Sequence, residues 1–233
     1  YHVVFSNLSR PKGFGWSLTS AITFYESDVH FDKSRFLENH DSEDYLNIFR
    51  SDFSITRAKF SNSFADALDI DFSNGNITDV LFLECGTEDK NGDCLDISGS
   101  TLTLSRTRID GAADKALSIG ENSMVVASDI SISHATVGVV SKDSSKIKLD
   151  NLSISKCSFG FAAYQKKKEF GPAYIEATNF SSESIETLHV LEKGSSLILN
   201  ETPKVQFSKK HPLERIIPLT RMRNASSETL KNF

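Results

Sequence analysis

The chain has 233 residues, of which 39% are hydrophobic and 24% are charged, and its formal net charge is -5. This composition is typical of a folded protein rather than a disordered one, and the apolar runs are too short to span a bilayer. We therefore expect no membrane insertion. The negative net charge argues against a nucleic-acid partner, so we also expect no nucleic-acid binding. Because the chain begins at Tyr1 rather than Met, we expect a processed fragment with further domains of the same chain beyond it.

Residues 1–20 have the pattern of an irregular, partial first coil. Phe5-Ser6-Asn7 matches Phe60-Ser61-Asn62 in a later, more regular stretch. The segment "PKGFGWSLTS" then interrupts the pattern, and we expect Trp16 to cover the first regular coil. A solenoid that opens in mid-coil exposes unpaired backbone, so we expect the native protein to extend further in the N-terminal direction.

A repeat of about 22 residues occupies most of the remaining chain, as self-alignment shows. Each period holds short apolar-alternating runs separated by Ser, Gly, Asn and Asp, and no run has helical spacing over a helical length. The apolar anchor positions, at spacings of 24, 22, 27, 22, 22, 22 and 27, are Ile22, Leu46, Leu68, Leu95, Leu117, Val139, Phe161 and Leu188. A second column, with spacings of 24, 22 and 27, consists of Phe36, Phe60, Phe82 and Ile109. Two columns with the same spacings predict an all-β parallel solenoid of about eight coils.

The segments "FSNSFADALDIDFSNG", "GDCLDISGS" and "DKALSIGENS" resemble the coils of right-handed parallel β-helix proteins of the pectate-lyase-like superfamily. The resemblance covers about residues 20–200 and is closest to the bacterial secreted or surface type. It implies a right-handed parallel β-helix over residues 1–202 and a secreted or cell-surface location. Members of this superfamily include polysaccharide lyases, glycoside hydrolases and scaffolds without catalytic activity, so the resemblance is specific for fold and not for activity.

One strand of the repeat carries aspartates between its apolar residues, in the sequence "ADALDIDFSNG". If the anchors point inward, the residues that follow them point outward. The outward carboxylates of two adjacent coils then gather into an acidic cluster, which comprises Asp66, Asp69, Asp71, Asp93 and Asp96. Carboxylates stacked roughly 5 Å apart repel one another, so they should share a proton or hold a cation.

The acidic cluster allows three interpretations. All five aspartates can be calcium ligands, because Ca²⁺ prefers carboxylate oxygens, and the resembling pectate lyases hold calcium in this way. A pair of them, such as Asp69 and Asp96, can act as acid and base in glycoside hydrolysis. Alternatively their role is structural, in which case we expect Asp93 to pair with Lys115.

Basic residues follow the acidic cluster along the same face. A lyase acting on a uronate needs a base and a stabilising cation, which makes Asp69, Asp96, Lys115 and Lys142 the candidate catalytic residues. Lys142 lies three coils beyond Asp71, about 14 Å along the axis. The candidate substrate-binding residues are Asn47, Arg50, Tyr164, Gln165 and Lys166. The segment "YQKKKEFG" is alternatively a solvated loop that leaves the sheet.

Two functions are compatible with this sequence. The first is an extracellular carbohydrate-associated module that binds or cleaves a polysaccharide or another extracellular polymer, with calcium as the cofactor. If it is an enzyme, we expect a polysaccharide lyase or a glycoside hydrolase. The second is a scaffold or interaction module, without catalytic activity, of a larger surface protein.

The sequence contains three cysteines, and two of them are close together in the chain. Cys85 and Cys94 flank a five-residue insertion and are placed to form a disulfide, which leaves Cys157 free and buried.

From Pro203 the composition changes, and residues 201–233 carry seven Lys and Arg against three Glu, a net charge of +4. We expect residues 203–233 to cap the solenoid or to run back along its acidic flank.

Overall fold

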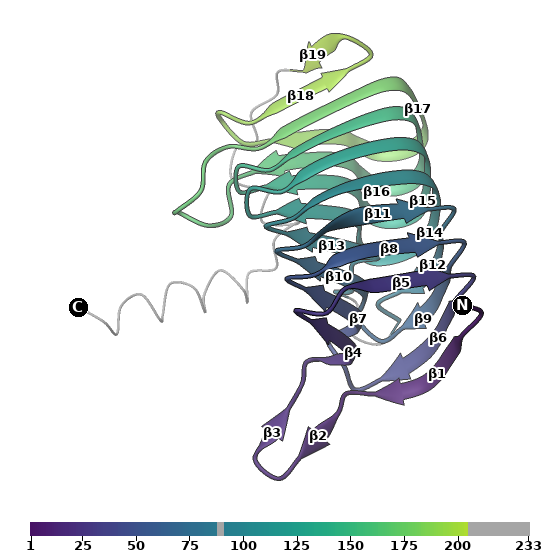
Figure 1. Ribbon diagram of the computed structural model, residues 1–233. Coiled ribbons are helices and arrows are strands. Elements are labelled where there is room, and N and C mark those ends of the chain that lie inside the picture. The colour runs from purple at the N-terminus through teal and green to yellow at the C-terminus, as the bar shows by residue number, and fades with distance from the viewer. Residues whose placement is uncertain (88–90, 205–233) are drawn as a thin grey trace.

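The computed structural model describes residues 1–87 and 91–204. The described residues form a parallel β-solenoid of about eight turns and contain no helix (Figure 1), which confirms the predicted fold class. It follows that this part of the chain has no helix long and apolar enough to cross a membrane.

Three faces, A, B and C, run along the solenoid. Face A begins with β4 (Ser20–Tyr25), β7 (Asp44–Phe49), β10 (Asp66–Asp71) and β13 (Leu95–Ser98). Face B includes β5 (Val29–Asp32), β8 (Asp52–Thr56), β11 (Asn74–Thr78) and β18 (Ser196–Leu199). Face C begins with β1 (Val4–Ser9), β6 (Arg35–His40), β9 (Lys59–Ser63) and β12 (Leu81–Cys85). Each later coil is one long strand through faces B, C and A: β14 (Thr101–Gly120), β15 (Met124–Lys142), β16 (Lys146–Tyr164) and β17 (Tyr174–Leu191).

The predicted anchor column stacks inside face A. The strand register pairs each anchor with the next in parallel, from Ile22 through to Phe161. The prediction was wrong for Leu188, because Phe161 pairs with His189 instead. The interval between these paired residues is 28 rather than the predicted 27, because the loop between β16 and β17 is one residue longer than the spacing suggested.

Aromatic rings fill the core behind face C. Phe5, Phe36, Phe60 and Phe82 occupy one inward column, and consecutive ring centroids lie 5.1, 4.3 and 5.0 Å apart with nearly parallel planes. The pairing of Phe5 with Phe36 shows that β1 belongs to the same column as the later coils, as the sequence predicted. Such continuous packing gives a repeat protein its stability, because each coil buries its apolar edge on the next one.

A ladder of buried serines turns the chain from face A to face B. The backbone amide of Ser73 donates to Ser100 Oγ at 2.9 Å, and the amide of Ser100 donates to Ser123 Oγ at 3.0 Å. The same bond joins Ser51 to Ser73 and Ser123 to Ser145. Each hydroxyl therefore satisfies a turn amide that the strand ladders leave unpaired, which is why small polar side chains occur at this corner.

The first and last described segments depart from the regular coils. A hairpin of β2 (Lys12–Gly13) and β3 (Trp16–Ser17) projects from the N-terminal end (Figure 1), and Trp16 is 57% exposed. Trp16 therefore does not cover the first coil as expected, because its ring packs over Gly13 of its own hairpin. At the other end β19 (Thr202–Lys204) pairs antiparallel with β18 and covers that strand's free edge. The rest of the predicted 203–233 segment lies outside the described residues.

The predicted cysteine chemistry is confirmed. Cys85 and Cys94 form a disulfide at the base of the insertion, and Cys157 is free and buried. The insertion itself contains residues 88–90, which lie outside the described part of the chain.

Candidate functional site

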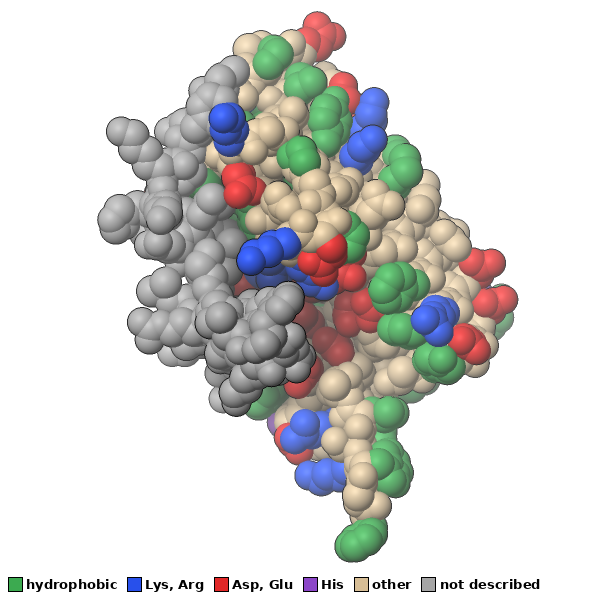
Figure 2. Space-filling model, turned by 90° about the vertical axis from the view of Figure 1, so that its left-hand side faces the viewer, with side chains coloured by type: hydrophobic (Ala, Val, Ile, Leu, Met, Phe, Trp, Pro, Cys, Tyr) green, Lys and Arg blue, Asp and Glu red, His purple; other side chains and the backbone are tan. Residues whose placement is uncertain are grey.

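The outward column of face A brings the predicted site residues together. The register pairs Asn47 with Asp69, Asp69 with Asp96, and Asp96 with Ser118. Acidic side chains gather in the middle of this face with basic side chains directly beside them (Figure 2). The acidic cluster predicted from the sequence is therefore a real spatial group.

Asp66, Asp93 and Asp96 lie closest together within the cluster. Each offers a carboxylate oxygen, and these three oxygens lie within 4.8 Å of one another. The backbone amide of Asp93 donates to Asp66 Oδ1 at 2.7 Å. Burial, followed by the charges of Asp93 and Asp96, raises the pKa of Asp66 well above its usual value. These three oxygens are the arrangement in the cluster that comes nearest to a cation site.

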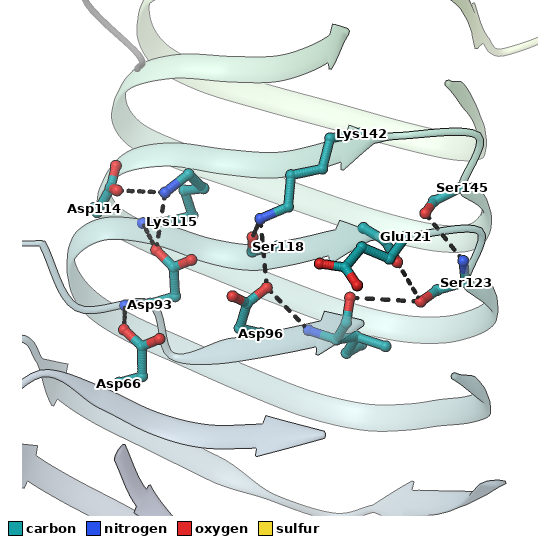
Figure 3. Close-up of polar contacts among 12 residues, drawn as sticks. Asp66, Asp93, Asp96, Asp114, Lys115, Ser118, Glu121, Ser123, Lys142 and Ser145 are labelled. Carbon is teal, nitrogen blue, oxygen red and sulfur yellow. Dashed lines mark hydrogen bonds and ion pairs between the residues drawn. The ribbon is translucent and has the colours of Figure 1, made fainter. Parts of the chain in front are cut away.

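Lys115 already neutralises part of this group. Its Nζ lies 3.2 Å from Asp93 Oδ1 and also donates to Asp114, while its backbone amide donates to Asp93 Oδ1 at 3.0 Å (Figure 3). The predicted ion pair between Asp93 and Lys115 is thus confirmed. Burial alone would lower the pKa of Lys115, but the two carboxylates outweigh burial and raise it. Burial raises the pKa of Asp93 to about 6, which leaves it ionised at neutral pH.

The side chain of Lys142 reaches back across two coils. The backbone of Lys142 lies three coils beyond that of Asp71, as expected. Its side chain nevertheless returns toward the acidic cluster, where Lys142 Nζ lies 3.5 Å from Asp96 Oδ1 and donates to Ser118 Oγ at 2.9 Å (Figure 3). Gly120 makes this path possible, because a Cβ there would come within 2.7 Å of Lys142 Cε. Burial would raise the pKa of Asp96, but the charges of Lys142 and Lys115 prevail and lower it. Burial alone would lower the pKa of Lys142, but Asp96, Tyr164 and Asp93 together outweigh burial and raise it.

Asp69 and Asp71 form a carboxylate pair next to Asp96. Asn47 Nδ2 donates to Asp69 Oδ2 at 2.8 Å and to Asp71 Oδ2 at 2.9 Å. Burial raises the pKa of both aspartates, and neighbouring carboxylates raise that of Asp69 further. Burial and the nearby carboxylates favour retention of a proton by this pair, which is one of the two outcomes expected for crowded aspartates, whereas donation from Asn47 opposes protonation of Asp71 because it stabilises the charged form.

The other predicted substrate-binding residues have different positions. Tyr164 is only 2% exposed, and burial raises the pKa of its hydroxyl, so a polymer cannot reach it in this arrangement. Gln165 Nε2 donates to carbonyl oxygens of its own loop, that of Phe170 included. The backbone amide of Lys166 donates to Asp143 Oδ1 at 2.6 Å. This segment leaves the strand after Tyr164, as the loop interpretation predicted.

Sequence reasoning missed an exposed aromatic ladder at the edge of face A. The rings of Tyr25 and Phe49 stack at 5.5 Å, and Phe72 lies 5.6 Å beyond Phe49. Tyr25 and Phe72 are 55% and 51% exposed. Arg50, a predicted substrate-binding residue, lies over the Phe49 ring at 5.2 Å. The sequence feature that could have revealed the ladder is the aromatic residue three positions after each of the anchors Ile22 and Leu46.

The fold and this face define the protein as a parallel β-solenoid with an acidic cluster and an aromatic ladder on one side. Comparison with protein-family models finds no match, and comparison with curated protein sequences finds none either.

Proposed function

We propose that this chain is a polysaccharide-binding β-helix module without catalytic activity, from a secreted or cell-surface protein of the pectate-lyase-like type. The observation that carries the proposal is the aromatic ladder of Tyr25, Phe49 and Phe72. Exposed apolar groups that are contiguous, rather than scattered, are typical of binding surfaces.

The ladder suits a linear sugar polymer. Its three rings come from three successive coils, so they follow the solenoid axis, and the apolar C–H faces of pyranose rings stack on aromatic rings. Arg50 adds hydrogen-bond donors beside the rings for sugar hydroxyl groups. Asp71 and Glu26 also lie at this edge and would repel a uronate, so the proposed ligand is a neutral polysaccharide.

The state of the lysines argues against a lyase. A catalytic base must be unprotonated when it removes the proton next to the sugar carboxylate. The pKa of Lys115 and that of Lys142 are both raised by carboxylates that they already contact, so both remain ammonium ions at neutral pH. The same contacts hold these side chains within the protein, where they are 8% exposed.

The disulfide supports an extracellular location. Disulfides persist mainly in oxidising compartments, and the structure contains such a bond between Cys85 and Cys94. This is an argument from redox chemistry and is independent of the resemblance to a secreted family.

Affinity electrophoresis in a gel that contains a soluble neutral β-glucan or xylan tests the proposal. We expect the polymer to retard the protein, and Phe49→Ala to weaken binding at least ~10-fold through loss of the central ring. Met124→Ala is the matched control, because Met124 is 57% exposed on face B and should not affect binding. No retardation by any polymer, equal effects of the two substitutions, or release of reducing ends by the wild-type protein would contradict the proposal.

Calcium-dependent binding of an acidic polysaccharide is a second candidate, because the oxygens of Asp66, Asp93 and Asp96 converge within 4.8 Å. Calcium at ~100 times its Kd would add about 2.7 kcal/mol to the free energy of unfolding. Asp66→Asn and Asp96→Asn should remove this effect, because each removes a carboxylate of the converging group, whereas Asp129→Asn, at an exposed site elsewhere, should retain it. An unchanged Tm at millimolar calcium, relative to a chelator control, would assign the cluster a structural role.

A further inference from the structure

The outward side of face A is half-buried at the acidic cluster and fully buried in the coils beyond it, although it faces away from the solenoid core. Beyond the acidic cluster it carries an apolar patch of six side chains, each at most 4% exposed, which form a cluster separate from the core: Val137, Val140, Phe159, Ala162, Tyr164 and Val190. Ser118, between the two groups, is fully buried.

Face B shows what an uncovered outward face looks like in this protein. Val126 and Met124 occupy outward positions there and are 60% and 57% exposed. Val140 belongs to the same strand, β15, and is fully buried. The strands among the described residues all belong to the solenoid or to the hairpin β2–β3, so none of them forms a second layer over face A.

We propose that residues 205–233, the C-terminal segment of this same chain, dock along the outward side of face A. This inference goes beyond the proposed function, since the aromatic ladder at the edge of the face remains exposed.

The described chain ends in the right place for such a segment. β19 runs antiparallel to β18 and ends with Lys204 opposite Leu197, next to the turn that joins face A to face B in the last coil. Burial and then the charge of Lys204 lower the pKa of His189, which is consistent with that position beside the last strand of face A. The segment therefore begins next to Val190, at the apolar end of the face.

The length of the segment is sufficient. The outward column from Val190 to Asp69 spans five strand spacings, or about 24 Å. The 29 residues of 205–233 would cover about 43 Å as a helix and about 100 Å when extended.

The chemistry of the segment is complementary to the face. It contains six Lys and Arg against two Glu, a net charge of +4, whereas residues 1–204 carry -9. Its apolar residues, including Leu213, Ile216 and Ile217, alternate with basic residues both before and after them, such as Lys210 and Arg221. The segment therefore carries both kinds of group that the face requires, apolar side chains for the patch near Val190 and cations for the acidic cluster. Such pairing would both cover apolar surface and offset the excess of carboxylates.

Photo-crosslinking of the full chain identifies the occupant. A diazirine amino acid replaces Val140, and the same replacement at Val126 on face B is the control. An equal mixture of ¹⁴N- and ¹⁵N-labelled chains separates crosslinks within one molecule from those between copies. We expect crosslinks from position 140 to peptides of 205–233 in the same molecule, and none to them from position 126. Mixed-isotope crosslinks would instead assign a second copy to the face, and crosslinks confined to residues 1–204, or none, would also overturn the proposal.

Thiol accessibility provides an independent measurement in the full chain. The native cysteines are either disulfide-bonded or buried, so Val140→Cys and Val126→Cys each introduce one reporter. We expect maleimide to modify position 140 at least ~100-fold more slowly than position 126, because the segment must first open. Arg221→Glu with Arg223→Glu should accelerate modification at 140, whereas Lys146→Glu with Lys156→Glu, at exposed positions, should not. Equal rates at positions 140 and 126, or no response to the arginine reversals, would refute docking by this segment.

Discussion

Replacement of Lys142 by Met tests whether the long reach of this side chain holds face A together. Lys142 Nζ lies 3.5 Å from Asp96 Oδ1, and the two side chains are 8% and 24% exposed. At an effective dielectric of 20 the Coulomb energy at this distance is about 5 kcal/mol before desolvation is counted. Loss of one partner of a buried pair costs about 3–5 kcal/mol, and since Asp96 is partly exposed we expect about 2–4 kcal/mol. For a chain of this size that corresponds to a fall in Tm of about 5–15 °C.

Thermal unfolding followed by circular dichroism measures this change, and Lys146→Met at an exposed position of the next coil is the matched control. Because Lys142 holds the pKa of Asp96 below its usual value, the contribution of the pair is complete above the pKa of an unfolded aspartate and is lost as pH falls through the folded pKa. The difference between wild type and Lys142→Met should therefore shrink below about pH 4. The double variant with Asp96→Asn should recover about 1–3 kcal/mol relative to additivity. A loss within about 0.5 kcal/mol, equal to that of Lys146→Met, would refute the reasoning.

Three further predictions concern the serine ladder, the pH dependence and the disulfide. Ser100→Ala should lower the free energy of unfolding by about 1–3 kcal/mol, because the buried amide of Ser73 loses its acceptor. Urea unfolding measures this loss, and a loss no larger than that of Ser131→Ala, at an exposed site, would contradict the prediction. Burial raises the pKa of Asp44 to about 6, so this group binds more protons in the folded than in the unfolded protein between about pH 4 and 6. The Tm should therefore rise from pH 7 to pH 5, and it should rise less in Asp44→Asn. A Tm that does not change over this pH range would be inconsistent with the prediction. Replacement of Cys85 and Cys94 by Ser should lower the free energy of unfolding by about 2–3 kcal/mol, and an unchanged urea midpoint would exclude this contribution.

The strand order and most of the register could be predicted from the sequence, because a parallel solenoid places equivalent residues of successive coils directly on one another. Any column that recurs at the repeat interval, such as the anchors from Leu46 to Phe161, therefore reports the register itself. The same logic placed Asp69 beside Asp96, since this relation depends only on coil length and on alternation along a strand. The disulfide between Cys85 and Cys94 was predictable for a different reason, because the two cysteines flank one short insertion.

Tertiary structure alone decided which of these residues contact each other through their side chains. Lys142 meets Asp96 because Gly120 leaves room for its path, and repeat spacing contains no information about the direction of a long side chain. Phe72 joins the aromatic ladder because its backbone has a positive φ of 48° and its ring lies over Gly99. The burial of Val140, an outward residue by its position in the strand, likewise depends on what lies over the face. The sequence by itself determined the solenoid, because stacking is a periodic property, whereas the site depends on packing between residues that the period does not relate.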